Sequence, residues 1–488
     1  MAQAERSQLR VVMFPWLAHG HITPYLELAR RLTKTTTTNQ TNLDVVVHLV
    51  STPVNLASIA HHETDRIRLV ELHLPEQPNL PPSLHTTKHL PARLMPALKR
   101  ACDLAAARFG ALLDAIRPDL LLYDFLQPWA PVEARNRGVP AAHFSTCSAA
   151  ATAFFVHHCL HLDEGASRAA FPFEGVGLGG AEEEAKYTEL FVMREVPGAL
   201  VADRDRLLLS LARSEGFVAV KTCAEMERPY MDYLSRRLLL LGGGGGNKEM
   251  IPCGPLLVDH HGDGTDAEDV TRWLEEQDPG SVVLVSFGTE YFMSESQMAE
   301  LARGLELSGH RFLWVVRFPK EHDDEDDGHV AAAQSMPRGF EPAARGMVVE
   351  GWAPQRRVLG HSACGAFLTH CGWSSVMEAM AAGVPMVALP LHIDQPINAN
   401  LAAELGAAVR VPQHRRFGEF RAEDVARAVR AVMRGEGEGK EVRRRAAEMR
   451  EVVARSDADH DDAQIGALLQ RMARLCGKDQ QASHLALL

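Results

Sequence analysis

Two histidines lie where a parallel α/β fold binds its ligands, directly after the first apolar run of the chain. The run LRVVMF (9–14) predicts a buried strand, and we expect a loop with His19 and His21 before an amphipathic helix. Open α/β sheets bind ligands beyond the carboxyl ends of their strands. A neutral imidazole there can take a proton from a hydroxyl group at physiological pH. The spacing leaves both histidines open, and a histidine that only caps the helix is the alternative.

A carboxylate closes a second predicted strand. Residues 120–123 form the short apolar run LLLY, and Asp124 follows it. A carboxylate at that edge can bond the far nitrogen of a catalytic histidine, set its tautomer and stabilise its cation. From the residues alone, a helix cap for the next segment is the better interpretation of Asp124.

A third group of chemically useful residues follows the apolar run GAFLTH (365–370), which predicts a buried strand. The turn after it places Gly372, Ser374 and Ser375 at the start of a helix. The first-turn N–H groups and the positive end of the helix dipole favour a phosphate at such a position. His370, at the end of the strand, adds a donor to the same anion.

Residues around this turn suit the rest of a nucleotide sugar. Glu378 lies one helical turn further in, where a carboxylate fits a ribose diol. Trp352 offers a flat apolar face for a base. Asp394 and Gln395, just past the next apolar run, can accept from and donate to sugar hydroxyls. Together these residues predict a site for a base, a ribose, a diphosphate and a second sugar.

The stretch 352–395 resembles the signature box of plant family-1 UDP-sugar glycosyltransferases. The match covers W-x-P-Q at its start, H-C-G-W in its middle, the downstream glutamate, and D-Q at its end. The resemblance implies an α/β fold with the GT-B architecture, in which two doubly wound parallel-sheet, Rossmann-like domains face each other across a cleft. The N-terminal domain would hold the acceptor and the base, and the C-terminal domain the UDP-sugar.

The resemblance also selects among the candidate residues. In this family the general base stands three residues before the proline of its loop, which fits His21 and Pro24 and not His19. It makes Asp124 the partner of that base and lets Thr146 face the donor sugar. Many relatives have asparagine where this chain has Ser374, so that contact is lost or made through water. The donor-binding residues implied by the resemblance are Thr289, Trp352, Ala353, Gln355, His370, Gly372, Trp373, Ser374, Ser375, Glu378, Asp394 and Gln395.

The implied reaction is an inverting transfer from UDP-glucose, with no metal and no other cofactor. Several segments resemble a branch whose members extend sugar chains on existing glycosides. The predicted acceptor is therefore a sugar hydroxyl of a flavonoid, lignan or terpenoid glycoside. An aglycone O-glucosyltransferase and a non-catalytic nucleotide-sugar-binding protein are the alternatives, although the latter should lack the base. The segments of the branch resemblance are FPWLAHGH, STPVNL, LPPSLHTTKHLP, YDFLQPWAP, VSFGTEYFMS and HIDQPINA.

The elements that must position these residues alternate as strands and helices in both halves of the chain. We expect an N-terminal domain at 1–258, a Gly/Asp-rich linker at 259–271 and a C-terminal domain at 272–460, with a last helix at 461–476 that packs back onto the first domain. Within the first domain we expect one long helix at 92–116. Another expectation there is a mobile connection at 171–186.

Composition narrows the class of protein. A chain of 488 residues is too long for one ordinary core. Its net charge of −12 argues against nucleic-acid binding, and no G-x-G-x-x-G follows the first strand as in dehydrogenases. Eight scattered cysteines without a C-x-x-C pair favour a reducing compartment. The N-terminus predicts neither a signal peptide nor a membrane span, so we expect a cytoplasmic protein. A monomer is a separate expectation, which these features do not determine. His157 and His161 would share a helix face, but no matching ligand pair predicts a metal site.

Overall fold

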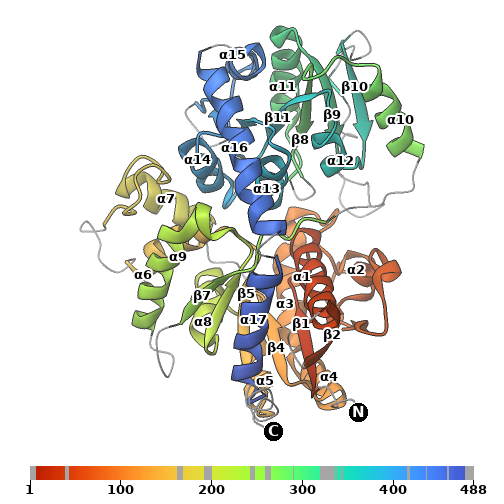
Figure 1. Ribbon diagram of the computed structural model, residues 1–488, viewed down its shortest axis with the longest axis vertical. Helices are drawn as coiled ribbons and strands as arrows, with labels where there is room; N and C mark the ends of the chain where they lie inside the picture. The colour runs from red at the N-terminus through yellow and green to blue at the C-terminus, as the bar shows by residue number, and fades with distance from the viewer. Residues whose placement is uncertain are drawn as a thin grey trace. The chain divides into compact units, whose positions relative to one another are not determined.

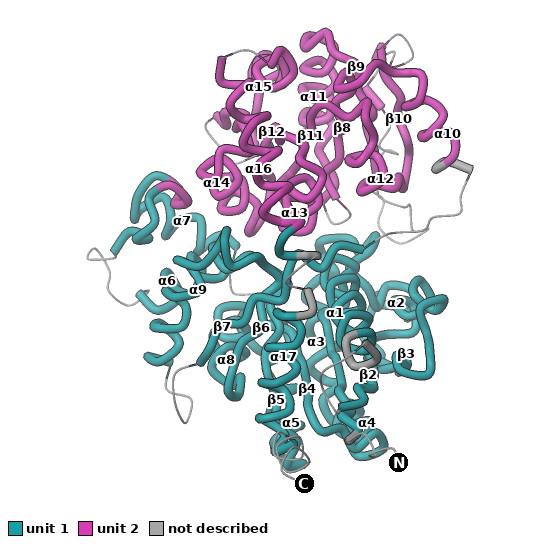
Figure 2. The backbone as a smooth tube through the Cα atoms, in the orientation of Figure 1, with its two compact units in different colours: residues 1–174, 179–258, 455–488 teal, residues 175–178, 259–454 magenta. Residues whose placement is uncertain are grey.

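The chain folds into two compact units, each built on a parallel sheet (Figures 1 and 2). The first unit comprises residues 1–174, 179–258 and 455–488, and the second comprises 175–178 and 259–454. The computed structural model describes residues 7–38, 43–161, 169–191, 200–241, 248–258, 265–288, 291–318, 336–337, 339–340, 342, 345–414, 418–435, 437–458 and 461–478.

The described part of the first unit contains a seven-stranded sheet in the order β3-β2-β1-β4-β5-β6-β7. Each neighbouring pair is parallel. Parallel strands are covered by helices on both faces, which explains why β4 and β5 are buried along their whole length. The strands are β1 (Ser7–Phe14), β2 (Leu43–Ser51), β3 (Ile67–Glu71), β4 (Leu120–Tyr123), β5 (Ala141–Ser145), β6 (Phe217–Val220) and β7 (Glu249–Pro252).

Helices on the two faces of this sheet form two separate cores, because successive strand side chains point to opposite faces. Leu9 and Val11 of β1 belong to one core, and Val12 and Phe14 belong to the other. The α-helices of the unit are α1 (His19–Thr38), α2 (Pro53–Ala57), α3 (Met95–Leu104), α4 (Ala106–Ile116), α5 (Ala130–Arg135), α6 (Ala149–Leu160), α7 (Ala181–Phe191), α8 (Asp203–Arg213), α9 (Ala224–Leu238) and α17 (Asp461–Leu475). Short 3-10 turns lie at Ala60–His62, Pro82–Leu84, Ala92–Leu94 and Leu239–Leu241.

The order of strands reverses in the middle of the sheet. The chain builds outward from β1 through β2 to β3, then returns to place β4 on the other side of β1. Phe14, the last residue of β1, is in register with Tyr123, the last residue of β4. The segments that leave these two strands therefore start side by side, at the position where open α/β sheets bind ligands.

The second unit repeats this arrangement with six strands in the order β10-β9-β8-β11-β12-β13. Its reversal lies between β8 and β11, where Ser286 is in register with Thr369. The strands are β8 (Val282–Ser286), β9 (Arg311–Val316), β10 (Gly346–Glu350), β11 (Cys364–Thr369), β12 (Met386–Ala388) and β13 (Ala408–Arg410). The helices are α10 (Thr265–Glu275), α11 (Glu295–Ser308), α12 (Gln355–Leu359), α13 (Trp373–Ala382), α14 (Gln395–Glu404), α15 (Ala422–Arg434) and α16 (Glu438–Ala458), of which residues 455–458 belong to the first unit. Residues 259–264 of the predicted linker lie outside the described residues, and α10 begins at Thr265.

Two expectations about the first unit are wrong in detail. His19 and His21 do not lie in a loop, because α1 begins at His19 and the carbonyl of Ala18 accepts the N–H group of His21. The helix expected at 92–116 is divided at Ala105, which separates α3 from α4. Ala105 is fully buried, and the break lets both helices contribute side chains to one core.

The expected mobile connection at 171–186 is also wrong. Asn400 of α14 donates hydrogen bonds to the carbonyls of Val176 and Gly177, at 3.0 and 2.7 Å. Val176 is fully buried, and α7 begins only a few residues later at Ala181. Periodicity does not reveal this anchor because its donor is more than two hundred residues away.

Helix α17 completes one core of the first unit. Leu468 and Leu469 are fully buried in the core that also contains Leu28 of α1, and Figure 1 shows α17 beside α1. On the outer side, Arg471 pairs with Glu249 of β7 at 2.6 Å. Among the described residues, no helix combines the length and the apolar character that a bilayer crossing requires.

We expect Leu469→Ala to destabilise the first unit by about 2–5 kcal/mol, because it leaves a cavity in a packed core. Calorimetry and urea titration measure the loss. The matched control is Gln470→Ala on the exposed side of the same helix, which should change stability by no more than about 0.5 kcal/mol. Equal effects of the two substitutions would contradict a core position for α17.

Candidate active site

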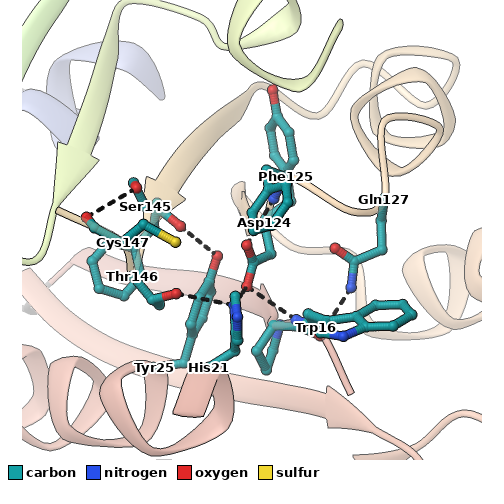
Figure 3. Close-up of polar contacts among 12 residues, drawn as sticks. Trp16, His21, Tyr25, Asp124, Phe125, Gln127, Ser145, Thr146 and Cys147 are labelled. Atoms are coloured by element: carbon teal, nitrogen blue, oxygen red, sulfur yellow. Dashed lines mark hydrogen bonds and ion pairs between the residues drawn. The ribbon is translucent and has the colours of Figure 1, made fainter. Parts of the chain in front are cut away.

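His21 and Asp124 meet where the chain leaves β1 and β4 (Figure 3). The distance from His21 Nδ1 to Asp124 Oδ2 is 2.7 Å. The carboxylate is fully buried, whereas 17% of the histidine side chain is exposed. A carboxylate at Nδ1 places the ring proton on that nitrogen and the basic lone pair on Nε2. The pair has the chemistry of a general base and its orienting acid.

The structure keeps the Asp124 carboxyl ionised despite its burial. Burial acts to raise its pKa, but the interaction with His21 and the N–H group of Trp16 outweigh that effect, and the pKa is lowered. Trp16 N donates to Oδ2 at 3.1 Å, and Phe125 N donates to Oδ1 at 2.7 Å. A fixed negative charge is therefore present at neutral pH to stabilise an imidazolium on His21.

Other contacts hold the histidine and its surroundings (Figure 3). Thr146, which was predicted to face the donor sugar, has its hydroxyl 2.9 Å from Nδ1 of His21. Two oxygen neighbours at Nδ1 restrict rotation of the ring. Gln127 donates to the carbonyl of Pro15 at 3.0 Å, which ties the segment after β4 to the loop after β1.

The predicted phosphate-binding turn lies after β11 in the second unit. His370 is 9% exposed, and burial lowers its pKa to about 4, although the nearby backbone of Ser286 partly opposes the shift. At neutral pH it is therefore a neutral N–H donor. A Cβ atom on either Gly288 or Gly372 would lie 2.7 Å from its Nε2 atom. Both positions require glycine so that the backbone can approach the ring.

The turn delivers the start of α13 to the edge of the sheet. Gly372 is the N-cap residue and supplies no side-chain cap to the first-turn N–H groups, which suits an anion. Ser374 and Ser375 lie in the first turn. Asn398 fixes the turn by donating to the carbonyl of Cys371 at 3.1 Å.

A polar cluster joins α12 to α13 next to this turn. Gln355 donates to Glu378 Oε2 at 2.8 Å and to the Ser375 hydroxyl at 3.2 Å. Ala353 is buried, whereas Trp352, which is predicted to stack on the base, is 38% exposed. The structure thus brings together Gln355 and Glu378, two of the residues predicted to bind the nucleoside.

The two residues predicted to bind the sugar lie at the start of α14. The side-chain oxygen of Gln395 accepts the N–H groups of Leu391 and His392, at 2.8 and 2.9 Å. Its amide can therefore serve a sugar hydroxyl only as a donor. Asp394 accepts from Asn398 at 2.9 Å. Trp373, the remaining predicted sugar contact, is buried at the start of α13.

Some expectations lie outside these clusters. Thr289 is outside the described residues. His157 uses both ring nitrogens, with Tyr233 Oη at 2.6 Å and the carbonyl of Ala169 at 3.0 Å. Within the ranges that the structure describes, no three His, Cys, Asp or Glu side chains are grouped to hold a metal ion. Sequence reasoning missed Gly288 and Asn398. A glycine just after an apolar strand is a usable signal for the first, whereas nothing local marks the second.

Comparisons with known proteins agree with this geometry. Residues 265–446 match the family described as UDP-glucoronosyl and UDP-glucosyl transferase. Mogroside IIIx synthase of Siraitia grosvenorii is 37% identical over 473 residues, covering 94% of this chain and 96% of the relative. Beta-D-glucosyl crocetin beta-1,6-glucosyltransferase of Gardenia jasminoides is 38% identical over 434 residues, covering 86% and 90%. The structure of Glycyrrhiza uralensis UGT73P12 complexed with glycyrrhetinic acid 3-O-monoglucuronide matches with a TM-score of 0.78 at 24% identity, covering 99% and 98%.

The chain therefore belongs to the family of UDP-glucuronosyl and UDP-glucosyl transferases, in its plant family-1 group. It is an inverting UDP-glycosyltransferase with the GT-B fold. The family, the fold class and the enzyme class predicted from the signature box are confirmed.

We expect Gly372→Ala to weaken UDP binding at least about 10-fold, because the new methyl group must displace the His370 ring or the turn. Isothermal titration calorimetry with UDP measures the loss. Gly360→Ala is the control, since its Cβ atom would meet its nearest neighbour at an ordinary 3.5 Å. Unchanged UDP affinity in the Gly372 variant would contradict a diphosphate site at the start of α13.

Proposed function

We propose that this enzyme transfers glucose from UDP-glucose, with inversion, to a sugar hydroxyl of a plant specialised-metabolite glycoside. The observation that carries the catalytic part is the 2.7 Å contact between His21 and the buried Asp124. It supplies a base that can be protonated and a fixed charge that stabilises the protonated form. A protein that only binds nucleotide sugars has no need of such a pair.

The proposed mechanism is a single displacement. Nε2 of His21 takes the proton of the acceptor hydroxyl, and Asp124 stabilises the imidazolium. The acceptor oxygen forms a bond to the anomeric carbon as the bond from that carbon to the diphosphate breaks, with the electron pair leaving on UDP. The start of α13, His370 and Ser375 meet the charge on the leaving diphosphate. Trp352, with Gln355 and Glu378, holds the nucleoside.

We propose glucose as the donor sugar on the basis of the residues at the start of α14. Gln395 acts there as an amide donor because its oxygen is engaged with the backbone. Asp394 acts as an acceptor, and a hexose hydroxyl pair needs both kinds of group. UDP-sugar use by the family supports a nucleotide-sugar donor, and Gln395 together with Trp373 favours glucose by resemblance.

The acceptor class rests on the relatives and on the segments that resemble the sugar-extending branch. The Gardenia relative is named for transfer onto a glucosylated crocetin, which is already a glycoside. Direct glucosylation of aglycones is the alternative within the same enzyme class. We further assign the enzyme to the cytoplasm and expect it to be a monomer. We also propose that it works without a metal ion, because its proposed base is a histidine.

Removal of the base should abolish turnover and leave donor binding intact. We expect His21→Ala to lower kcat about 100- to 10,000-fold, with UDP affinity unchanged because the predicted UDP site lies in other residues. Quenched-flow or mass-spectrometric rates and UDP calorimetry measure the two quantities. Thr33→Val, which removes a buried hydroxyl elsewhere on α1, is the control and should keep its kcat. An active His21→Ala enzyme would rule out the proposed base.

The acceptor class can be tested with matched compounds. UDP-glucose is offered with aglycones of flavonoids, lignans and triterpenes and with their monoglucosides, and products are followed by mass spectrometry. We expect mass gain on the monoglucosides, and NMR of the product then gives the linkage. UDP-xylose and UDP-glucuronate, run in parallel, check the donor. Efficient gain on aglycones alone would place the enzyme in the alternative acceptor class.

A further inference from the structure

Helix α8 holds the backbone of the segment that carries Asp124. Ser210 donates its hydroxyl to the carbonyl of Phe125 at 2.8 Å, and Arg206 donates from Nη1 to the carbonyl of Leu126 at 2.8 Å. These carbonyls belong to the two residues that follow Asp124. Both donors are fully buried.

Two more bonds join the same elements. Arg213 donates from Nη1 to the carbonyl of Pro128 at 2.6 Å. In the opposite direction, the hydroxyl of Tyr123 donates to the backbone carbonyl of Ser210 at 2.6 Å. One face of α8 therefore binds the segment on both sides of Asp124.

Arg206 is itself rigidly held. Its two terminal nitrogens donate to the two carboxylate oxygens of Asp103 on α3, at 2.8 and 2.6 Å. A bidentate pair fixes both position and orientation of a guanidinium group. Burial of the pair makes its rearrangement costly. The bond from Arg206 to Leu126 thus starts from a fixed donor.

The peptide groups of Phe125 connect this helix to the catalytic pair. The N–H group of Phe125 donates to Asp124 Oδ1 at 2.7 Å, and its carbonyl accepts from Ser210 (Figure 3 shows Asp124 and Phe125). Movement of that residue would move a donor of the carboxylate. The other oxygen, Oδ2, bonds His21 and Trp16.

We propose that Ser210 and Arg206 are positioning residues, which hold Asp124 in the orientation that His21 requires. The proposal rests on the role of Asp124 given under the proposed function. The hydrogen bonds described for Ser210 and Arg206 go to the backbone of Phe125 and Leu126 and to Asp103, and the proposed mechanism assigns neither residue a role in binding the substrates. Their contribution is to geometry, and displacements on the order of 1 Å can cost about 100-fold in rate.

Ser210→Ala is the sharpest variant, because it removes one hydroxyl and leaves the backbone carbonyl that Tyr123 needs. We expect kcat to fall about 10-fold, with the Kd for UDP unchanged. Ser308→Ala is the matched control, since it removes a buried serine hydroxyl that donates to the Leu305 carbonyl at 2.7 Å in the second unit. Its kcat should stay at the wild-type value.

A double-mutant cycle separates positioning from general stability. In an Asp124→Asn background, Ser210→Ala should cause no further loss of kcat, because the carboxylate charge that Ser210 is proposed to orient is no longer present. A further 10-fold loss in that background would overturn the proposal. If Asp124→Asn alone keeps wild-type kcat, the proposed role of Asp124 fails, and the positioning proposal fails with it.

A second substitution protects the test against misfolding. Arg206→Lys keeps a positive charge opposite Asp103, but an ammonium group cannot reproduce the fork that serves both the carboxylate and the Leu126 carbonyl. We expect Arg206→Lys to lower kcat about 10-fold in the wild-type enzyme with the Kd for UDP unchanged. In the Asp124→Asn background, we expect it to cause no further loss of kcat. A melting temperature is measured for each variant to show which variants are folded. The kcat values of the double-mutant cycle are then compared for the folded variants only. Wild-type kcat in a folded Arg206→Lys enzyme would remove Arg206 from the proposal.

Discussion

The reversal of strand order within each parallel sheet is the constraint on which both sites depend. In each sheet the chain first adds strands on one side of the starting strand and later places a strand on its other side. The connections that leave these two neighbouring strands run in opposite directions, so the segments just after the strands lie side by side. In the first unit these segments bring His21 from β1 to Asp124 from β4. In the second they bring Gly288 from β8 to His370 from β11. Each candidate site lies at the reversal of its sheet, where segments that leave two neighbouring strands start side by side.

The two sites solve opposite electrostatic problems. The first must hold a full negative charge where burial opposes it, so Asp124 is surrounded by donors: the N–H groups of Trp16 and Phe125 and the ring of His21. The second is the predicted diphosphate site, which would accept negative charge from a ligand. Its own groups are neutral donors, with His370 uncharged at neutral pH and a helix start without a side-chain cap. Both sites therefore supply hydrogen-bond donors to an anion. In the first the anion is the protein's own carboxylate, and in the second it would be a ligand.

Prediction from the sequence succeeded where function is encoded locally. The signature box identifies its strand, its helix and their connecting turn within a few tens of residues. The structure places Gln355 in contact with Ser375 and Glu378, a contact that the spacing did not predict. The choice of His21 over His19 needed the family resemblance, because a strand followed by two histidines does not say which one faces Asp124. Helix boundaries were less predictable, as the break at Ala105 depends on packing against a sheet and not on a helix-breaking residue. The bonds from α8 to the Asp124 segment join residues about 80 positions apart, and no periodic pattern reveals them.

The distribution of these features along the chain bears on how such enzymes diversify. The family match at 265–446 falls within the second unit, which carries the predicted donor site. The first unit contributes the His21–Asp124 pair and the backbone that holds it. If α8 sets the orientation of Asp124 through the backbone of Phe125 and Leu126, the side chains that line the acceptor can change without disturbing the base. A rigid support behind the catalytic acid would then be the physical condition for variation of the acceptor.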